Sequence, residues 1–245
     1  MDIGTYQAAA AMEMLEHWQD MTAMNVASMQ KPGHKEMIPV MYASSPIKAD
    51  KNSPNSVNSY IPECDSQVNF APGSLEITDV PTHLALGEPN HFFELIDPEG
   101  NKVYTRDGTF HFNKDNQLVS ASGYYKVSNN GSAPILQVNN GYPIHVSNNG
   151  KIQQGEQEIG TIGVFKLDPS NIEVTSGGYK LKKAKEAPAA QKFEVIQGAL
   201  EMSNVKAPEQ MTRMIHIQHH HDTNAESIKI LDASLGKLIQ NIYSS

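Results

Sequence analysis

Two segments at opposite ends of the chain carry apolar residues at helical spacing. From Ile3 to about Ser28 there is no proline, and no glycine follows Gly4. The residues that return every three or four positions, as on one face of an amphipathic helix, are Ala11, Met14, Leu15, Trp18, Met21 and Thr22. We predict that this helix ends near Gln30, because the proline and glycine of Lys31-Pro32-Gly33 stop a helix.

The second helical segment follows Pro208 and continues toward the C-terminus. Its apolar residues form a stripe with steps of three and four, which we call the seam: Met211, Met214, Ile217, Ile228, Leu231, Leu235, Leu238 and Ile242. Polar His221 and Asn224 fill the two intervening places. A heptad stripe is typical of a helix that packs against another helix, and single polar seam residues fix the register of such a pair. We therefore expect the two terminal helices to pair as a coiled coil.

The middle of the chain changes to short alternations of apolar and polar residues. Segments with this pattern, which is typical of strands, are 75–77, 84–86, 92–96, 103–104, 109–112, 117–119, 124–127, 135–138, 144–146 and 159–167. Turn sequences rich in Asn, Asp and Gly separate them, at 97–100, 114–116, 129–131, 139–141 and 148–150. Such turns join antiparallel strands, because Asn and Gly tolerate the left-handed backbone that hairpins need. We predict an antiparallel all-β domain of about ten strands.

These patterns predict an α+β fold in which paired terminal helices flank an inserted β-domain. The expected division is an N-terminal helical portion at 1–43, a linker or irregular arm at 44–69, the β-domain at 70–193 and a C-terminal helical portion at 194–245. The linker prediction rests on residues 44–67, which are rich in Ser, Asn, Pro, Lys and Asp and have no periodicity.

Composition narrows the class of protein. A net charge of −8 and a sequence pI near 5.6 argue against a nucleic-acid partner, because no basic stripe is present to neutralise phosphates. The single cysteine, Cys64, excludes an internal disulfide and leaves the redox compartment open. The first thirty residues lack the basic and apolar regions of a cleaved export signal, and no run is long enough for a membrane span. We expect no direct membrane insertion.

No catalytic constellation is visible in the sequence, so we expect no enzyme activity and no cofactor. His216 and His220 share a helix face, but a third metal ligand and a positioned acid are missing from the pattern. We therefore predict no metal site. Arg106 precedes Asp107-Gly108, a pair typical of a hairpin turn. We expect Arg106 to pair with a nearby acid or backbone carbonyl.

Four blocks resemble a known family. The blocks are Asn25-Val26-Ala27-Ser28 with Pro32-Gly33-His34-Lys35, Phe70-Ala-Pro-Gly-Ser-Leu-Glu-Ile-Thr78, Tyr104-Thr-Arg-Asp-Gly-Thr-Phe110 and Gln197-Gly-Ala-Leu-Glu-Met-Ser-Asn-Val205. They are similar to motifs of the bacterial flagellar axial proteins, in the rod and hook–basal-body group. The fourth block is the most specific. In and beside the first block Asn25, Ala27, Gly33 and Lys35 agree with the family motif, whereas Met24, Ser28, Lys31 and His34 depart from it.

The resemblance implies a structural subunit of the basal-body rod, a hollow shaft that transmits torque. Such subunits polymerise with themselves and with other rod and hook proteins, and they leave the cell through the flagellar type III export apparatus without a cleaved signal peptide. The implied location is the periplasm-spanning rod, and the chain resembles the proximal rod protein more than the distal one. The implied assembly interface comprises Met14, Leu15, Trp18, Met21, Asn25, Ala27, Leu200, Glu201, Ser203, Asn204, Val205, Met211, Met214, His221, Asn224, Ile228, Leu231, Leu235 and Leu238.

Two other classes stay open at this point. An extracellular binding or adhesin module with a coiled-coil stalk would need an aromatic platform, yet the one tryptophan, Trp18, lies in the N-terminal helix. A hydrolase built on the His216–His221 run would need stoichiometric zinc in the purified protein.

Overall fold

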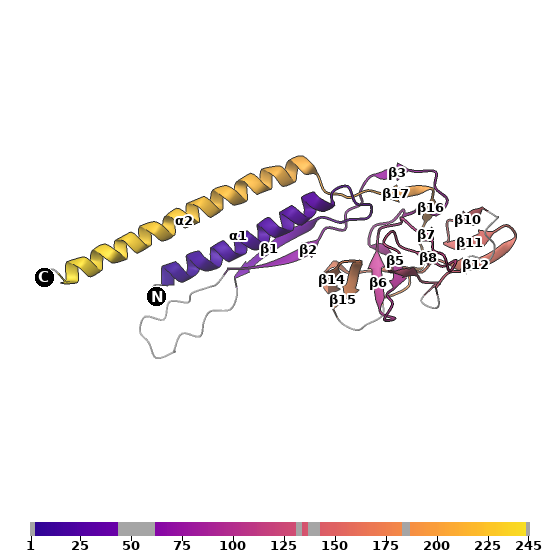
Figure 1. Cartoon of the computed structure of the whole chain (residues 1–245), viewed down its shortest axis with the longest axis horizontal. Coiled ribbons are helices and arrows are strands. Elements are labelled where there is room, and N and C mark those ends of the chain that lie inside the picture. The colour runs from indigo at the N-terminus through magenta and orange to yellow at the C-terminus, as the bar shows by residue number, and fades with distance from the viewer. Residues whose placement is uncertain (1–2, 44–61, 131–133, 137–142, 183–186, 244–245) are drawn as a thin grey trace. The chain divides into compact units, whose positions relative to one another are not determined.

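The computed structural model of the chain describes residues 3–43, 62–130, 134–136, 143–182 and 187–243. The chain divides into two compact units. One, the helical unit, comprises Met1–Ala27, Met37–Gln67 and Lys206–Ser245; the other, the β unit, comprises Ser28–Glu36 and Val68–Val205. Two long helices and a large antiparallel β-domain between them in the sequence confirm the α+β class (Figure 1).

The helical unit contains helix α1 (Ile3–Ser28), strands β1 (Met37–Ala43) and β2 (Pro62–Val68), and helix α2 (Ala207–Tyr243). Helix α1 ends where the sequence predicts, since Lys31 N–H bonds to the carbonyl of Ser28 at 3.0 Å. Strands β1 and β2 pair with each other. The prediction of irregular structure is wrong for residues 62–67, where polar side chains such as Asp65 and Ser66 hide a strand that β1 stabilises.

The β unit is built around one large sheet. Its strand order is β14 (Ile172–Thr175), β15 (Gly178–Leu181), β6 (Lys102–Thr105), β5 (His91–Ile96), β9 (Lys126–Val127), β8 (Leu118–Val119) and β7 (His111–Phe112), and β13 (Val164–Lys166) also pairs with β5. A three-stranded sheet contains β10 (Ile144–Val146), β11 (Lys151–Gln154) and β12 (Gln157–Thr161). A short 3₁₀-helix, Pro169–Asn171, precedes β14.

Two small sheets attach the C-terminal part of the β unit to its beginning. Strand β16 (Val195–Gln197) pairs with β4 (Leu84–Leu86), and β17 (Ala199–Glu201) pairs with β3 (Leu75–Ile77). Gly198, at φ +75°, joins the two C-terminal strands, and its carbonyl accepts the N–H of Thr78 at 2.8 Å. The stretch before α2 is therefore β-structure inside the β unit.

Turn chemistry is confirmed at three of the predicted sites. Gly100 (φ +87°) closes the turn between β5 and β6, Asn116 (φ +57°) lies between β7 and β8, and Gly150 (φ +80°) lies between β10 and β11. The predicted turn at 139–141 and part of the one at 129–131 lie outside the described residues. The predicted hairpin turn at Asp107-Gly108 is wrong, because β6 pairs with β5 and β15 while β7 pairs with β8.

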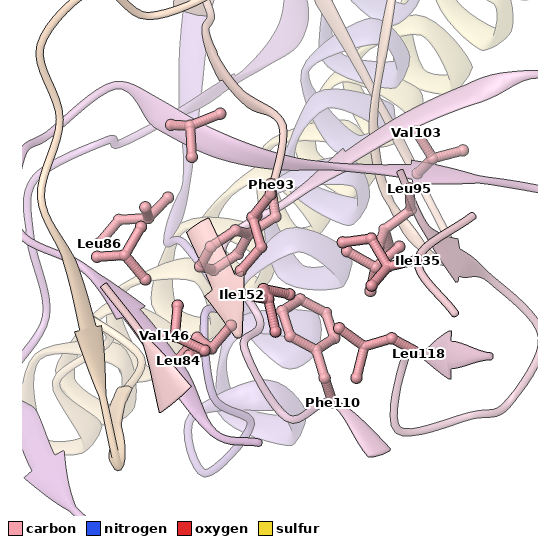
Figure 2. Packing of buried hydrophobic residues seen from close by; sticks show 14 residues of the cluster. Leu84, Leu86, Phe93, Leu95, Val103, Phe110, Leu118, Ile135, Val146 and Ile152 are labelled. Carbon is pink, nitrogen blue, oxygen red and sulfur yellow. The ribbon is translucent and has the colours of Figure 1, made fainter. Parts of the chain in front are cut away.

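The core of the β unit comprises two apolar clusters. The larger one includes Phe93, Phe110 and Ile152, and Figure 2 shows their side chains among those of Leu95, Leu118 and Ile135. The rings of Phe93 and Phe110 meet edge to face, with centroids 5.3 Å apart. Each of these side chains contributes about 1.5–3 kcal/mol by its removal from water. The burial of this cluster stabilises the β unit.

Candidate functional site

The predicted face of α1 is its buried face. Leu15 and Met21 are buried, and Met14 and Trp18 are half-buried. Ala27, which the family resemblance adds to the interface, is exposed. The helix therefore uses one stripe inside the helical unit, and its opposite side faces outward.

Asn25 ties three elements of the helical unit together. Its side-chain oxygen accepts the N–H of Met37 at 2.9 Å, and its amide nitrogen donates to the carbonyl of Met37 at 2.8 Å. The same nitrogen lies 3.4 Å from the side-chain oxygen of Gln210, which is also buried. The last turns of α1 are thereby fixed to the start of β1 and to the first turn of α2.

The seam of α2 is observed with one correction. Met214, Ile217, His221, Asn224, Ile228 and Leu231 are all buried or half-buried. Met211 is 58% exposed, whereas Gln210 is buried in the place expected for it. The reason is the helical spacing. Residues spaced alternately by four and three positions, as from Gln210 onward, stay on one face of the helix, whereas the two successive spacings of three that begin at Met211 turn away from that face. Seam positions Leu235 and Leu238 lie within α2, and their side chains are outside the described part of the chain.

Apolar side chains also remain exposed on the helical unit. On α2 they are Met211, Ile215 at 54% and Ile230 at 63%; Met24 on α1 and Val40 and Met41 on β1 are exposed too. Met211 and Ile215 lie one helical turn apart and form one patch. Helix α2 therefore has two apolar sides, one used within the subunit and one facing solvent.

The β unit holds a buried charge cluster, which we call the clasp: Lys35, Arg106 and Glu201. Lys35 Nζ lies 2.6 Å from Glu201 Oε1, and Arg106 Nε lies 2.6 Å from Oε2. All three side chains are at most 2% exposed. The backbone N–H of Gly73 donates to Oε1 as well, at 2.9 Å. The carboxylate thus bonds to two cations and one amide, which compensates the cost of burying it.

The remaining donors of the two cations bond to backbone carbonyls. Arg106 Nη1 donates to Glu88 and His91, both at 2.7 Å, and Nη2 donates to Leu86 at 3.2 Å. Lys35 Nζ donates to the carbonyl of Ala71 at 2.8 Å. The prediction that Arg106 pairs with an acid or a backbone carbonyl is confirmed on both counts.

Asn204 extends the clasp with amide hydrogen bonds. Its side-chain oxygen accepts the N–H of Glu36 at 2.8 Å, and its nitrogen donates to the carbonyls of Asn69 and Ala71 at 2.9 and 3.0 Å. The N–H of Gly33 donates to the carbonyl of Glu201 at 2.6 Å. Three segments distant in sequence, around residues 33–36, 69–73 and 201–204, are therefore joined in one network.

Two glycines allow these segments to approach so closely. A Cβ at Gly33, whose φ is +69°, would lie 2.2 Å from the backbone nitrogen of Asp107. A Cβ at Gly73 would lie 1.9 Å from the carbonyl oxygen of Met202. Neither backbone contact could form with a larger residue, so the clasp depends on both positions.

Burial and pairing act in opposite directions on the clasp. Burial alone would raise the pKa of Glu201, but the hydrogen bonds and charges of Arg106 and Lys35 outweigh it and lower that pKa. Burial lowers the pKa of Lys35, and its bond to Glu201 only partly opposes this effect. Burial also raises the pKa of the neighbouring Tyr179 hydroxyl. The glutamate is therefore held in its charged form.

The predicted C-terminal interface residues lie in or beside the clasp. Glu201 and Asn204 belong to its network, Leu200 is buried in β17, and Ser203 and Val205 are half-buried. The sequence did not assign Lys35, Asn69, Gly73 or Gln210 to the site. Lys35 lies in one of the blocks that resemble the family, and this is the sequence feature that could have identified it. Its pairing with Glu201 could not be predicted, because the two residues are 166 positions apart.

The features considered for other chemistry give no site in the described residues. His216, His219 and His220 are exposed on α2 and His221 is half-buried, and no group of three or more metal-ligating side chains is found among the described residues. Within the same residues, neither helix is sufficiently long and apolar to cross a membrane.

Comparison with known proteins identifies the relatives of the chain. Residues 88–154 match the model of the flagellar hook protein FlgE/F/G D1 domain, and residues 196–241 match that of the flagellar basal body rod FlgEFG protein C-terminal region. The chain is 28% identical to the flagellar basal-body rod protein FlgF of Mesorhizobium japonicum, over all of this chain and 99% of the relative.

Two basal-body rod proteins named FlgG are similar as well. That of Borreliella burgdorferi is 28% identical over 94% of this chain and 95% of its own length. That of Buchnera aphidicola subsp. Acyrthosiphon pisum is 31% identical over 69% of this chain and 68% of its own length. These matches do not support the alternative of an adhesin or binding module. The chain belongs to the flagellar basal-body rod protein family, whose members are structural proteins of the flagellar basal body and are not known as enzymes.

Proposed function

We propose that the chain polymerises through its helical unit into the hollow, torque-transmitting rod, and that it occupies the proximal part of that rod. The proximal position is supported by two FlgF relatives, 28% and 29% identical, that each match over the whole of this chain. In this proposal the subunit joins other rod and hook proteins in the periplasm-spanning rod and is exported through the flagellar type III apparatus without a cleaved signal peptide. It needs no nucleic acid and no direct insertion into a membrane.

The observation that carries the proposal is the second apolar side of α2. Exposure of the Met211 and Ile215 side chains to water is unfavourable, and exposed apolar patches of this kind favour association with another protein surface. The seam from Met214 to Leu231 is buried at Ile217 and half-buried elsewhere, so it is already partly covered within the subunit. In the proposal a neighbour covers Met211 and Ile215 with a different surface of its own, and such an unlike contact generates a helical filament when its rotation does not close a ring.

We propose that the portions into which the chain is predicted to divide have different functions. The helices within portions 1–43 and 194–245 assemble, the region 44–69 links them to the β-domain, and 70–193 forms the outer β-domain together with β16 and β17. Its support is that α1 and α2, with the exposed apolar residues they carry, belong to the flanking portions. The interface also includes coiled-coil pairing of the terminal helices along the seam, at positions such as Leu231, Leu235 and Leu238.

A charged residue on the outer side of α2 tests the proposal. We expect Ile215→Asp to reduce assembled rods at least tenfold, because docking would bury an unpaired carboxylate, and even 1.4 kcal/mol corresponds to tenfold in an equilibrium. The measurement is the number of hook–basal bodies seen by electron microscopy in cells whose own copy is replaced by the variant. Circular dichroism of the purified variant monitors the monomer fold.

Ser234→Asp is the matched control, since Ser234 is exposed on the same helix and the introduced charge is identical. We expect this variant to assemble normally. Normal rod numbers in the Ile215→Asp strain would refute assembly through this side of α2.

A further inference from the structure

The chain passes between its two units four times. It leaves the helical unit after Ala27, returns to it after Glu36, leaves again after Gln67 and returns for the last time after Val205. These four backbone connections are the covalent paths along which a force applied to one unit reaches the other.

Each connection is anchored in the β unit by a backbone or Asn204 hydrogen bond beside the clasp. Glu36, the last residue before the second crossing, donates its N–H to Asn204 and accepts the N–H of Asn69 at 2.8 Å. Asn69 follows the third crossing by one residue, and Asn204 precedes the fourth by one residue. The segment after the first crossing is held by the bond from Gly33 to Glu201.

We infer that the clasp is the mechanical joint of the subunit: it keeps the four connections together when force passes between the helical unit and the β unit. This inference rests on the proposed role in a torque-transmitting rod. It assigns Lys35, Arg106 and Glu201 a mechanical task that is separate from assembly.

The chemistry of the clasp suits this task. Bonds to an ionised group are short and directional, and about twice as strong as bonds between neutral groups. Separating Glu201 from Lys35 and Arg106 would leave three buried charges without their ionic partners, so partial opening is strongly unfavourable. Apolar packing at the same place would lack this directionality and would allow the segments to slide past each other.

Single-molecule pulling can separate a mechanical role from ordinary stability. With Cys64 replaced by Ser, single cysteines at exposed Ala23 in α1 and exposed Lys114 in the β unit carry the handles. The variant is Glu201→Gln, which keeps the shape but removes the charge. The control is Ile152→Ala, which weakens the core of the β unit away from the clasp. The thermal unfolding temperature of each variant is measured first. The loss of rupture force in each variant is then compared with its own loss of thermal stability.

We expect Glu201→Gln to reduce the force of the first rupture at least twofold, while Ile152→Ala leaves that force within the error of the wild type. Equal reductions in both variants, or no reduction in Glu201→Gln, would overturn the inference. If Glu201→Gln does not fold, Arg106→Lys replaces it, because lysine keeps the charge but loses the fork that reaches Leu86, Glu88 and His91. Rupture is measured on single subunits, so the result is independent of whether the chain polymerises.

Discussion

Two buried glutamates in the β unit are satisfied to different degrees. Glu201 is 2% exposed and bonds to Lys35, Arg106 and the amide of Gly73. Glu94, in β5, is 0% exposed and has one cation nearby, Lys102 Nζ at 3.5 Å, whose side chain is 33% exposed. Neither carboxylate oxygen of Glu94 has a hydrogen-bond partner among the described residues.

The difference shows which of the two charges the fold depends on. Removing the charge of Glu201 leaves Lys35 and Arg106 buried without an anion, and a buried ion without its counter-charge is costly. Removing the charge of Glu94 leaves Lys102, whose side chain already reaches water. A buried ion is therefore important for stability when its partners are buried too, and less so when its partner is solvated.

Glu201→Leu is the change from which we expect the largest effect. It leaves two buried cations without their anion, and breaking a buried pair in this way costs about 3–5 kcal/mol. Native domains are stable by about 5–15 kcal/mol in total, so the variant is expected to be close to unfolding. Urea denaturation of the purified protein, followed by circular dichroism, measures the loss.

The double variant Lys35→Met with Glu201→Leu sharpens this test. It removes one of the two stranded cations, and Arg106 keeps its three carbonyl partners. We expect the double variant to be more stable than Glu201→Leu alone, although it carries more changes, because neighbouring sites are not additive. A double variant that is less stable than the single one would show that the charges do not determine the stability of the clasp.

Acid should distinguish the two glutamates by a smaller amount. The pKa of Glu201 is lowered in the folded protein, so its contribution to stability is fully present above the ordinary glutamate pKa of 4.5 and is lost as pH falls through the lower folded value. One proton can change stability by at most about 1.4 kcal/mol per pH unit. We expect urea denaturation between pH 5 and pH 3 to give a shallower pH dependence for Glu201→Gln than for wild type. Identical slopes would mean that Glu201 is not held in its charged form by the clasp.

The partners in the clasp illustrate what the sequence could provide. Arg106 beside Asp107-Gly108 predicted a bond to an acid or a carbonyl, and the structure has both. The identity of the acid was not predictable, because Glu201 is 95 positions away and no periodicity connects the two. The Asp107-Gly108 signal was misread for a related reason: Gly108 is required by its close contact with the backbone of Leu84, and not by a hairpin.

The fold shows the same division between local and distant information. Helices α1 and α2 have long periodic patterns and were predicted, and hairpin turns with Asn or Gly at positive φ were predicted as well. Strands β16 and β17 were not, because three-residue strands around Gly198 have no periodicity of their own and are stabilised by pairing with β4 and β3. Gln210 was missed because a polar side chain in an apolar stripe is recognisable only from its partner, Asn25.

Glu94→Gln is expected to have the smallest effect and is the most direct test of the comparison. The amide has nearly the same shape, so packing in β5 is kept, and the buried charge is removed. Lys102 loses this ion pair, but its side chain is one-third exposed and its ammonium group can be hydrated. We expect a change in unfolding free energy of no more than about 1 kcal/mol, of either sign, since burying a charge without hydrogen bonds is itself unfavourable.

The same substitution at Glu201 is the matched control, measured by urea denaturation at pH 7, and it should cost several times more because both of its cations are buried. Equal losses at the two positions would mean that solvation of the partner does not decide the cost, and a large loss at Glu94 alone would mean that its pairing with Lys102 outweighs the price of burying it.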